Sequence, residues 1–565
     1  MRKLVTNAEM AEIDRRSIQE YEIPAVVLME NAGQNAYRAL AERLAGAPAE
    51  GAAACGNAGA GNPGPGTAAA GYSVVGDPTA GHPAAPRVVH LVFVAGSGNN
   101  GGDAMVMARA CHQEGLHDVT VVLARGTAKG NAAVNLTILR NLGVRIVDAS
   151  TDSAGAAAAA ADASGTPTSE AGISPEAAEA IDRADWIIDG VSGTGISGSL
   201  RSPLSDLVEA INKAPGRTCA VDVPSGVSDS HQAGALAAEA DLTLTMGTPK
   251  QCLYRPGARA KAGEIVTIPL SFPNELLADP ALEVELAELA DLTHLMPPIR
   301  KDAYKTRRGV VALFGGSVGK TGASLLAAEG AVRSGAGMVH LYVADDIYRT
   351  IAAAAGSIMV HPAGPDAAED AGAADAFVCG PGWGVGSAQE AALRALVGSE
   401  KPGVIDADGL NTAAAMLSQG AAGDLDGGGR VVMTPHPGEF SRLAGAYGVD
   451  PGDLLPALRE VARRSNSVIC YKSHVLFVAA PEGRIRVIDG MQPEIATAGA
   501  GDALAGIIGG LLARGMDAFD AAAAGVLVHQ EAGRRTAEDV GWFVTEDLFP
   551  RVSRVVGDFT ETVYA

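Results

Sequence analysis

A short run of small residues near the end of the chain contains the side chain best suited to catalysis. Residues 497–506 read Thr-Ala-Gly-Ala-Gly-Asp-Ala-Leu-Ala-Gly, which is typical of a tight turn that feeds a helix. The unpaired backbone N–H groups at the start of that helix would form an anion site. Asp502 would lie in the first turn, where it could take a proton from a hydroxyl that attacks a phosphoryl group. The alternative is that Asp502 only caps the helix.

Polar residues also follow apolar runs in the first half of the chain. Residues 99–103, Asn-Asn-Gly-Gly-Asp, come after the strand expected at 88–94. A second apolar run, 184–190, ends in Asp-Gly, and residues 222–226 read Asp-Val-Pro-Ser-Gly after a third. Because ligands bind at the carboxyl ends of parallel strands, these segments should meet at one edge of a sheet.

The residue types in these segments suit two kinds of ligand. The Asn-Asn-Gly-Gly turn would offer backbone N–H groups to a phosphate. Asp189 and Asp222, with side-chain oxygens of Asn100 and Ser225 nearby, would suit a hard monovalent or divalent cation. The alternative interpretation is that both carboxylates cap loops and that the Asn-Gly pair is only a turn.

The second half of the chain holds four more segments of this character. They are Gly-Gly-Ser-Val-Gly-Lys-Thr-Gly-Ala at 315–323, Gly-Pro-Gly-Trp-Gly at 380–384, Asp-Ala-Asp-Gly-Leu-Asn at 406–411 and Thr-Pro-His-Pro-Gly-Glu at 434–439. His436 stands between two prolines and could be only a rigid turn residue. Asp406 and Asp408 could be only helix caps.

The elements that would position these residues alternate between strand and helix, which is typical of βαβ units and a parallel sheet. Strands are expected at 88–94, 119–123, 144–147, 184–190, 219–222, 241–246, 263–268, 310–314, 339–343, 376–379, 403–406, 431–434 and 468–471, and helices at 6–44, 104–114, 132–142 and about 502–514. Residues 273–304 show no strand pattern, which predicts a domain boundary. Two stretches rich in Ala and Gly, about 45–86 and 150–175, predict insertions, the first of them a disordered surface loop.

The composition narrows the class of protein. At 565 residues the chain is too long for one hydrophobic core. Its net charge of −22 argues against a nucleic-acid or anionic-membrane partner, because both need a basic face. Six cysteines without a Cys-x-x-Cys pair indicate a reducing compartment. No apolar run has the length of a membrane span or a secretory signal, so we expect a cytoplasmic protein.

These motifs together resemble a known family. The set Asn-Asn-Gly-Gly-Asp, Asp-Gly-x-x-Gly-Thr-Gly and Asp-x-Pro-Ser-Gly is similar to that of NAD(P)H-hydrate epimerases, and the motifs of the second half are similar to those of ADP-dependent NAD(P)H-hydrate dehydratases. The tandem resembles the bifunctional bacterial NAD(P)H-hydrate repair enzymes. The resemblance implies an α/β chain with an N-terminal Rossmann-like parallel sheet and a C-terminal ribokinase-like domain. We expect the epimerase domain at 1–275, a linker at 276–304 and the dehydratase domain at 305–565.

In the first domain the resemblance assigns residues to the hydrated nucleotide and to potassium. The residues implied to bind the hydrate are Asn99, Asn100, Gly101, Gly102, Asp103, Gly193, Thr194, Gly195, Ile196, Ser197, Gly198, Ser199 and Asp222. Asn100, Asp189 and Ser225 would bind K⁺. Asp222 is the candidate acid/base for epimerisation, with Asp103 and Asp189 as alternatives.

In the second domain the resemblance implies that Gly384, His436 and Asp502 contact the hydrate. The residues implied to bind the adenine nucleotide are Lys472, Ser473, His474, Val475, Leu476 and Gly501. Asp502 would deprotonate the hydroxyl at C6 so that it attacks the β-phosphoryl of ADP, with Mg²⁺ accompanying the nucleotide. Members of this family commonly assemble, so we also expect a homo-oligomer.

Two departures from the family pattern concern the nucleotide. The family usually has Lys-Gly before a short strand and its Thr, whereas this chain has Lys-Ser-His-Val-Leu at 472–476. It also has Ala-Gly-Ala-Gly-Asp at 498–502 in place of Gly-Gly-Thr-Gly-Asp. The choice between ADP and ATP therefore stays open. The alternative functions are a vitamin or sugar kinase with an N-terminal nucleotide-binding domain, and a non-catalytic nucleotide-sensing scaffold.

Overall fold

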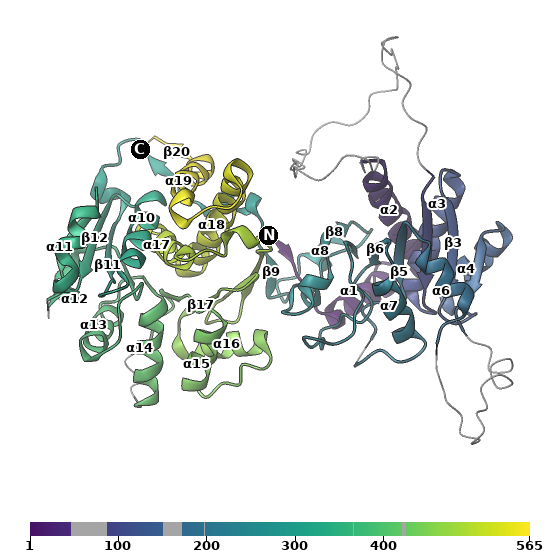
Figure 1. Ribbon diagram of the computed structural model, residues 1–565, viewed down its shortest axis with the longest axis horizontal. Helices are drawn as coiled ribbons and strands as arrows, with labels where there is room; N and C mark the ends of the chain where they lie inside the picture. Colours follow the sequence, from purple (N-terminus) through teal and green to yellow (C-terminus); the bar gives the residue numbers. More distant parts are fainter. Residues whose placement is uncertain (47–87, 151–171, 197, 365, 421–424, 565) are drawn as a thin grey trace, which may run out of the picture. The chain divides into compact units, whose positions relative to one another are not determined.

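The computed structural model describes residues 1–46, 88–150, 172–196, 198–364, 366–420 and 425–564. The expected insertions at about 45–86 and 150–175 lie mostly outside these ranges, and Ser197 lies outside them as well. By their contacts the described residues form two compact units (Figure 1). One contains residues 7–253 and 257–273, and the other contains residues 1–6, 254–256 and 274–565.

The unit formed mainly by residues 7–273 is built on a parallel sheet of seven strands in the order β4-β3-β2-β5-β6-β7-β8. Its strands are β2 (His90–Ala95), β3 (Asp118–Leu123), β4 (Arg145–Asp148), β5 (Trp186–Gly190), β6 (Arg217–Val221), β7 (Leu242–Met246) and β8 (Glu264–Ile268). Most of these strands are rich in Val, Ile or Leu because both faces of the sheet are covered. All seven match strands expected from the apolar pattern.

Helices cover both faces of this sheet. On one face α2 (Ala25–Gly46), α3 (Asn99–Glu114) and α4 (Gly130–Asn141) share a core with one set of strand side chains. On the other face α6 (Pro175–Asp182) and α7 (Leu204–Lys213) pack against the alternate set. The expected helix 6–44 is two helices, α1 (Asn7–Gln19) and α2, because the chain breaks before Pro24.

The second unit contains a mixed sheet of eleven strands in the order β1-β9-β19-β18-β17-β16-β15-β14-β11-β12-β13. Six of its strands match expected ones: β11 (Val310–Phe314), β12 (Met338–Val343), β14 (Ala376–Cys379), β15 (Gly403–Ile405), β16 (Val431–Met433) and β17 (Val468–Tyr471). The others are β1 (Arg2–Lys3), β9 (Val284–Leu286), β13 (Met359–Pro362), β18 (Val475–Ala479) and β19 (Ile485–Asp489). From β17 to β13 neighbouring strands are parallel.

Helices flank this sheet on both sides (Figure 1). The helices α10 (Thr321–Arg333), α17 (Ala500–Ala513), α18 (Ala518–Val540) and α19 (Leu548–Phe559) share one large core with the strands. The remaining long helices are α11 (Asp345–Ala354), α13 (Ser387–Gly398), α14 (Ala407–Ser418), α15 (Pro437–Ala446) and α16 (Leu454–Ser465). The run of Ala and Gly in α17 allows close packing: a Cβ on Gly506 would lie 1.8 Å from the Ala327 carbonyl oxygen.

The expectation that residues 273–304 lack strands is wrong. The β9 strand lies there and pairs with β1 and β19, and β10 (Ile299–Arg300) pairs with β20 (Thr562–Val563). Short strands of two or three residues carry too little periodicity to be recognised, and long-range pairing creates them. The first six residues thus belong to the same compact unit as the C-terminal half of the chain.

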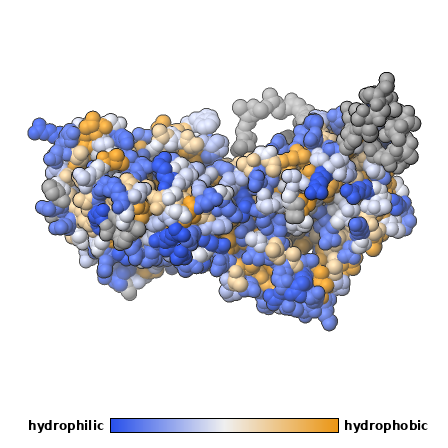
Figure 2. All heavy atoms as spheres, turned by 90° about the horizontal axis from the view of Figure 1, so that it is seen from below, coloured by the Kyte–Doolittle hydropathy of each residue, from blue (hydrophilic) through white to orange (hydrophobic). Residues whose placement is uncertain are grey.

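The surface is mainly polar. Figure 2 shows hydrophilic side chains over most of one face, with apolar side chains in small separate groups. Among the described residues, no helix combines the length and hydropathy that a membrane crossing requires. The five described cysteines, at positions 111, 219, 252, 379 and 470, are buried thiols that form no disulfide with one another.

Candidate active sites

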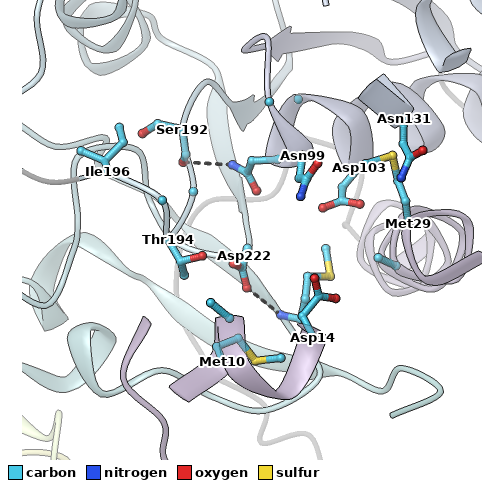
Figure 3. Close-up of a pocket in the computed structure, with 18 of the residues that line it drawn as sticks. Met10, Asp14, Met29, Asn99, Asp103, Asn131, Ser192, Thr194, Ile196 and Asp222 are labelled. Atoms are coloured by element: carbon cyan, nitrogen blue, oxygen red, sulfur yellow. Dashed lines mark hydrogen bonds between the residues drawn. The ribbon is translucent and has the colours of Figure 1, made fainter. Parts of the chain in front are cut away.

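A cavity of about 610 Å³ opens at the carboxyl edge of the seven-stranded sheet. It is lined by the segments that follow β2, β3, β5, β6, β7 and β8, and by residues of α1 and α2. Asn99, Asp103, Asp222, Thr194 and Ile196, all expected from the sequence, lie around it (Figure 3). Asn100, Gly101, Gly193 and Gly195 line it as well.

The Asn-Asn-Gly-Gly segment is the first turn of α3, and the expectation that it forms a turn ahead of a helix beginning at Ala104 is wrong. Helix α3 starts at Asn99, so its free N–H groups lie at the cavity. Gly101 permits this because a Cβ there would lie 2.0 Å from the Gly96 carbonyl oxygen. The helix terminus and the close approach of its backbone make an anion site.

Asp222 is held in a conformation unusual for a residue with a side chain. Its φ is +66°, in the left-handed region. Its Oδ1 accepts hydrogen bonds from the backbone N–H of Met246 at 3.0 Å and from Lys250 Nζ at 2.5 Å. These bonds keep the carboxylate pointed at the cavity, and a strained residue held in this way is common at active sites.

Lys250 is a candidate functional residue that the sequence analysis missed. Its side chain is fully buried, and its Nζ bonds only Asp222 and the Met246 carbonyl oxygen among the described atoms. A lysine is buried in this way when it neutralises a carboxylate. Lys250 follows β7 as Asp222 follows β6, so its position at a strand end was the signal that could have found it.

Two more carboxylates face the same cavity. Burial and the nearby charge of Asp222 hold the pKa of Asp103 well above its ordinary value, Lys250 opposes this shift, and Asp14 adds to it. Burial also raises the pKa of Asp14, a residue of α1 that the sequence analysis did not select. The cavity therefore pairs an ion-paired carboxylate, Asp222, with a carboxyl group that favours its protonated form, Asp103.

Asp189 lies behind the cavity wall and does not line it. It is fully buried, and it accepts hydrogen bonds from Ser225 Oγ at 2.6 Å, from Ser225 N at 2.8 Å and from Val191 N at 3.2 Å. Burial raises its pKa against these three bonds. In this position Asp189 joins the ends of β5 and β6, behind the residues that line the cavity.

Asn100 has a side-chain oxygen that could accept a further bond, and it lies near the strand ends that Asp189 and Ser225 join. Its Nδ2 donates to the Ser192 carbonyl oxygen at 3.0 Å, while its Oδ1 is buried without a hydrogen-bond partner among the described residues. A buried acceptor without a donor is rare in folded proteins and suits a cation. Gly198 and Ser199, which the resemblance also implied, do not line the cavity.

In the second unit Asp502 lies at the start of α17. The helix is capped by Gly499 at φ +89°, and Asp502 stands in its first turn, so it is not the cap. Burial raises the pKa of Asp502 to about 7, Asp406 adds to the shift, and Lys472 opposes it. A carboxyl group with this pKa at a helix N-terminus is matched to proton transfer near neutral pH.

Lys472 lies beside the same helix terminus. Its Nζ donates to Asp406 Oδ1 at 2.6 Å and lies 3.4 Å from the position of a Cβ on Gly501. Burial lowers its pKa, but the charge and hydrogen bond of Asp406 outweigh burial, so the net shift is upward. Asp406 also accepts from Thr434 Oγ1 at 2.6 Å and makes no capping bond to α14. Its carboxylate therefore positions Lys472 rather than capping a helix.

The other expected residues of this unit gather at the same edge of the sheet. His436 caps α15 through its Nδ1, which accepts from Gly438 N at 3.0 Å, and its side chain is 54% exposed, so the imidazole has both a structural role and access to a ligand. Asp408 accepts from Gly384 N at 2.8 Å and from Lys320 Nζ at 3.0 Å. Ser473 and His474 are in the β17–β18 turn, whereas the side chains of Val475 and Leu476 are in the core.

Two family models match the chain. Residues 25–252 match the model described as YjeF-related protein N-terminus, and residues 311–553 match the model described as NAD(P)H-hydrate dehydratase. The fold and the two sites thus define a two-domain α/β enzyme whose sites lie at the carboxyl edges of separate sheets.

Curated relatives cover both halves. A protein of Coxiella burnetii named bifunctional NAD(P)H-hydrate repair enzyme Nnr is 32% identical over 83% of this chain and 91% of its own. A protein of the same name from Salinibacter ruber is 32% identical over 98% of this chain and 96% of its own. The chain belongs to the family of bifunctional NAD(P)H-hydrate repair enzymes. A solved ADP/ATP-dependent NAD(P)H-hydrate dehydratase from Bacillus subtilis is 24% identical over 49% of this chain and 99% of its own, with a TM-score of 0.41.

Proposed function

We propose that this chain repairs hydrated NADH and NADPH by two reactions, one in each unit. The first interconverts the R and S hydrates, and the second converts the S hydrate to NAD(P)H while ADP becomes AMP and phosphate. The observation that carries the second reaction is the carboxyl group of Asp502, whose pKa is raised to about 7 beside a helix N-terminus. The alternative is a kinase in the second unit with a nucleotide-binding first unit. The carboxyl groups in the cavity of the first unit do not favour this alternative, because nucleotide binding alone does not need them.

In the dehydratase reaction Asp502 acts as the general base. It takes the proton of the C6 hydroxyl, the resulting oxygen attacks the β-phosphoryl of ADP, and AMP leaves. Phosphate is a better leaving group than hydroxide, so loss of phosphate from C6 and of a proton from C5 restores the dihydronicotinamide ring. The Lys472 ammonium and the N–H groups of α17 stabilise the charge on the transferring phosphoryl group.

In the epimerase reaction the centre at C6 loses and regains its configuration, either through loss and re-addition of water or through ring opening. Both routes need a base and an acid. Asp222, paired with Lys250, is suited to remove the hydroxyl proton. Asp103, whose pKa is raised well above its ordinary value, is suited to supply a proton on the opposite side. The N-terminus of α3 would hold the pyrophosphate.

The cations fit the two sites in different ways. Asn100 Oδ1, Asp189 and Ser225 would hold K⁺, which would supply positive charge next to the pyrophosphate; the unpartnered Oδ1 supports this assignment. In the second unit the described residues contain no group of three or more acidic, His or Cys side chains arranged for a metal. Mg²⁺ would therefore be held mainly by the phosphates of ADP and by water, as this ion prefers.

The test is recovery of absorbance at 340 nm from an R/S mixture of hydrated NADPH with K⁺, Mg²⁺ and ADP. Recovery of the whole mixture supports both reactions. If only the S portion is recovered, apart from what slow spontaneous epimerisation supplies, the first unit has no epimerase activity. No recovery with either ADP or ATP overturns the proposal and favours a kinase. The buried cysteine thiols and the net charge of −22 support a cytoplasmic enzyme, and sedimentation would test the proposed homo-oligomer.

A further inference from the structure

The cavity of the first unit extends along the sheet edge from β3 to β8, and its polar lining residues follow the strands from β3 to β7. In the order of the strands β3, β2, β5, β6 and β7, its lining residues include Arg125, Asn100, Ser192, Asp222 and Lys250. Each of these residues follows the strand with which it is paired in that order. The chemistry of the lining therefore changes along the edge from a cation, through backbone N–H groups, to an acid/base pair.

This order matches the order of groups along a dinucleotide. The reacting nicotinamide must lie at the Asp222 end, and the pyrophosphate fits the start of α3, which follows β2. The adenosine half then extends towards β3. Three strand spacings of about 4.8 Å separate β6 from β3, so the strands that precede Asp222 and Arg125 are about 14 Å apart. Figure 3 shows Asn131, which lies in the first turn of α4 after β3, well separated from Asp222.

Arg125 stands at the adenosine end with its charge available. It is exposed, it lines the cavity, and its guanidinium makes no hydrogen bond or ion pair within the described ranges. Asn131, which also follows β3, lines the cavity as well. The nearby acid is Asp148, close to Gly126, and its Oδ1 already accepts from the backbone N–H and the hydroxyl of Ser150.

We propose that Arg125 binds the 2′-phosphate on the adenosine ribose of hydrated NADPH, so that the epimerase site prefers the NADPH hydrate to the NADH hydrate. The inference rests on the proposed epimerase function. In parallel α/β sheets that bind dinucleotides, an acidic residue near this strand accepts from the 2′-hydroxyl, whereas an arginine accommodates the 2′-phosphate. The planar guanidinium can donate two parallel hydrogen bonds to a phosphate, and NADH offers it none.

The experiment uses the full chain without ADP, so that only epimerisation proceeds. The initial rate of R to S conversion is followed by chromatography for the hydrates of NADPH and NADH. In Arg125→Ala we expect the KM for the NADPH hydrate to rise about 10- to 100-fold, since a charge-assisted bond is lost, while the KM for the NADH hydrate stays within about twofold. In Arg125→Lys the KM for the NADPH hydrate should lie between those of the wild type and Arg125→Ala, because lysine keeps the charge but lacks the two parallel donors of the guanidinium.

The matched control is Arg183→Ala, which removes an equal charge from an exposed arginine that pairs with Glu179 before β5, at the opposite edge of the sheet. It should change neither KM.

Equal changes in the KM values of both hydrates in Arg125→Ala, or no change in either KM, overturn the role of Arg125. If the wild-type chain epimerises neither hydrate, the proposed epimerase function fails, and calorimetric titration with NADP⁺ and NAD⁺ then tests Arg125 by itself. Loss of a preference for NADP⁺ in Arg125→Ala supports the binding of the 2′-phosphate by Arg125. Unchanged binding of both nucleotides overturns it.

Discussion

The carboxylate of Asp222 accepts a hydrogen bond from the buried ammonium of Lys250 at 2.5 Å, although the two residues follow different strands and are 28 positions apart. The pair keeps a charged acceptor at the wall of a cavity without leaving a lone charge in the protein interior. Burial and, as the smaller cause, the charge of Asp222 in turn raise the pKa of its neighbour Asp103.

Replacing Lys250 should disable the epimerase and leave the dehydratase intact. In Lys250→Met the Asp222 carboxylate loses its partner, so we expect epimerisation to fall about 100-fold and the free energy of unfolding of that unit to fall by about 1.5–3 kcal/mol. Chromatography of the hydrates and thermal unfolding measure the two effects. Lys213→Met, an exposed lysine paired with Glu209, is the control and should change neither quantity. Full epimerase activity in Lys250→Met would contradict the role of the pair.

Replacing Asp502 should separate catalysis from nucleotide binding. Asp502→Asn keeps the shape of the side chain but removes the base, so dehydration should fall about 10²- to 10⁴-fold while ADP still binds and epimerisation continues. Absorbance at 340 nm and ADP titration measure the difference. Parallel loss of ADP binding and turnover would indicate a binding role instead, and unchanged turnover would remove Asp502 from the mechanism.

The raised pKa of Asp502 also predicts two opposite pH dependences. As a base it must be ionised, so dehydratase kcat/KM should fall as the pH drops below about 7. Its pKa is higher in the folded than in the unfolded chain, so the folded state binds more protons between pH 4 and 7, and stability decreases as the pH rises through that window. Asp502→Asn should therefore have a higher Tm than the wild type at pH 8 and a similar Tm at pH 4. An equal difference in Tm between the variant and the wild type at both pH values would contradict the raised pKa of Asp502.

Asp14 should tune the acid group of the epimerase. Its negative charge raises the pKa of Asp103, so Asp14→Asn should lower that pKa and move the alkaline limb of the epimerase pH profile to lower pH. The comparison is Glu12→Gln on the same helix, where the glutamate is exposed and paired with Arg15. The limb should stay in place in Glu12→Gln. If it also stays in place in Asp14→Asn, Asp14 does not act on Asp103.

The unpartnered oxygen of Asn100 predicts a change in potassium dependence. Asn100→Ala removes the Oδ1 acceptor, so the K⁺ concentration that half-activates epimerisation should rise about tenfold. Asn212→Ala is the comparison, because its amide bonds backbone atoms of residues 237 and 239, away from the cavity. An Asn100→Ala variant with an unaltered K⁺ requirement would place the cation elsewhere.

Much of this architecture follows from local sequence patterns. Most of the parallel strands are rich in Val, Ile or Leu because both of their faces are buried, and such segments are visible without a structure. The topology rule for parallel sheets then places Asp222 and Asp103 at one edge. The start of α17 could also be predicted from local sequence, because Gly499 and the residues after it are typical of a turn followed by a helix.

Other features depend on residues far apart in the chain. The two-residue strand β1 exists because it pairs with β9, some 280 positions later, and neither has a recognisable period. Asp14 reaches the cavity from α1, whose sequence shows only an ordinary amphipathic helix. The partner of Asp222 and the raised pKa of Asp502 likewise come from burial and from charges on distant segments. Local patterns determine which residue types end each strand, whereas burial and electrostatic coupling arise only when the folded chain excludes water and brings those ends together.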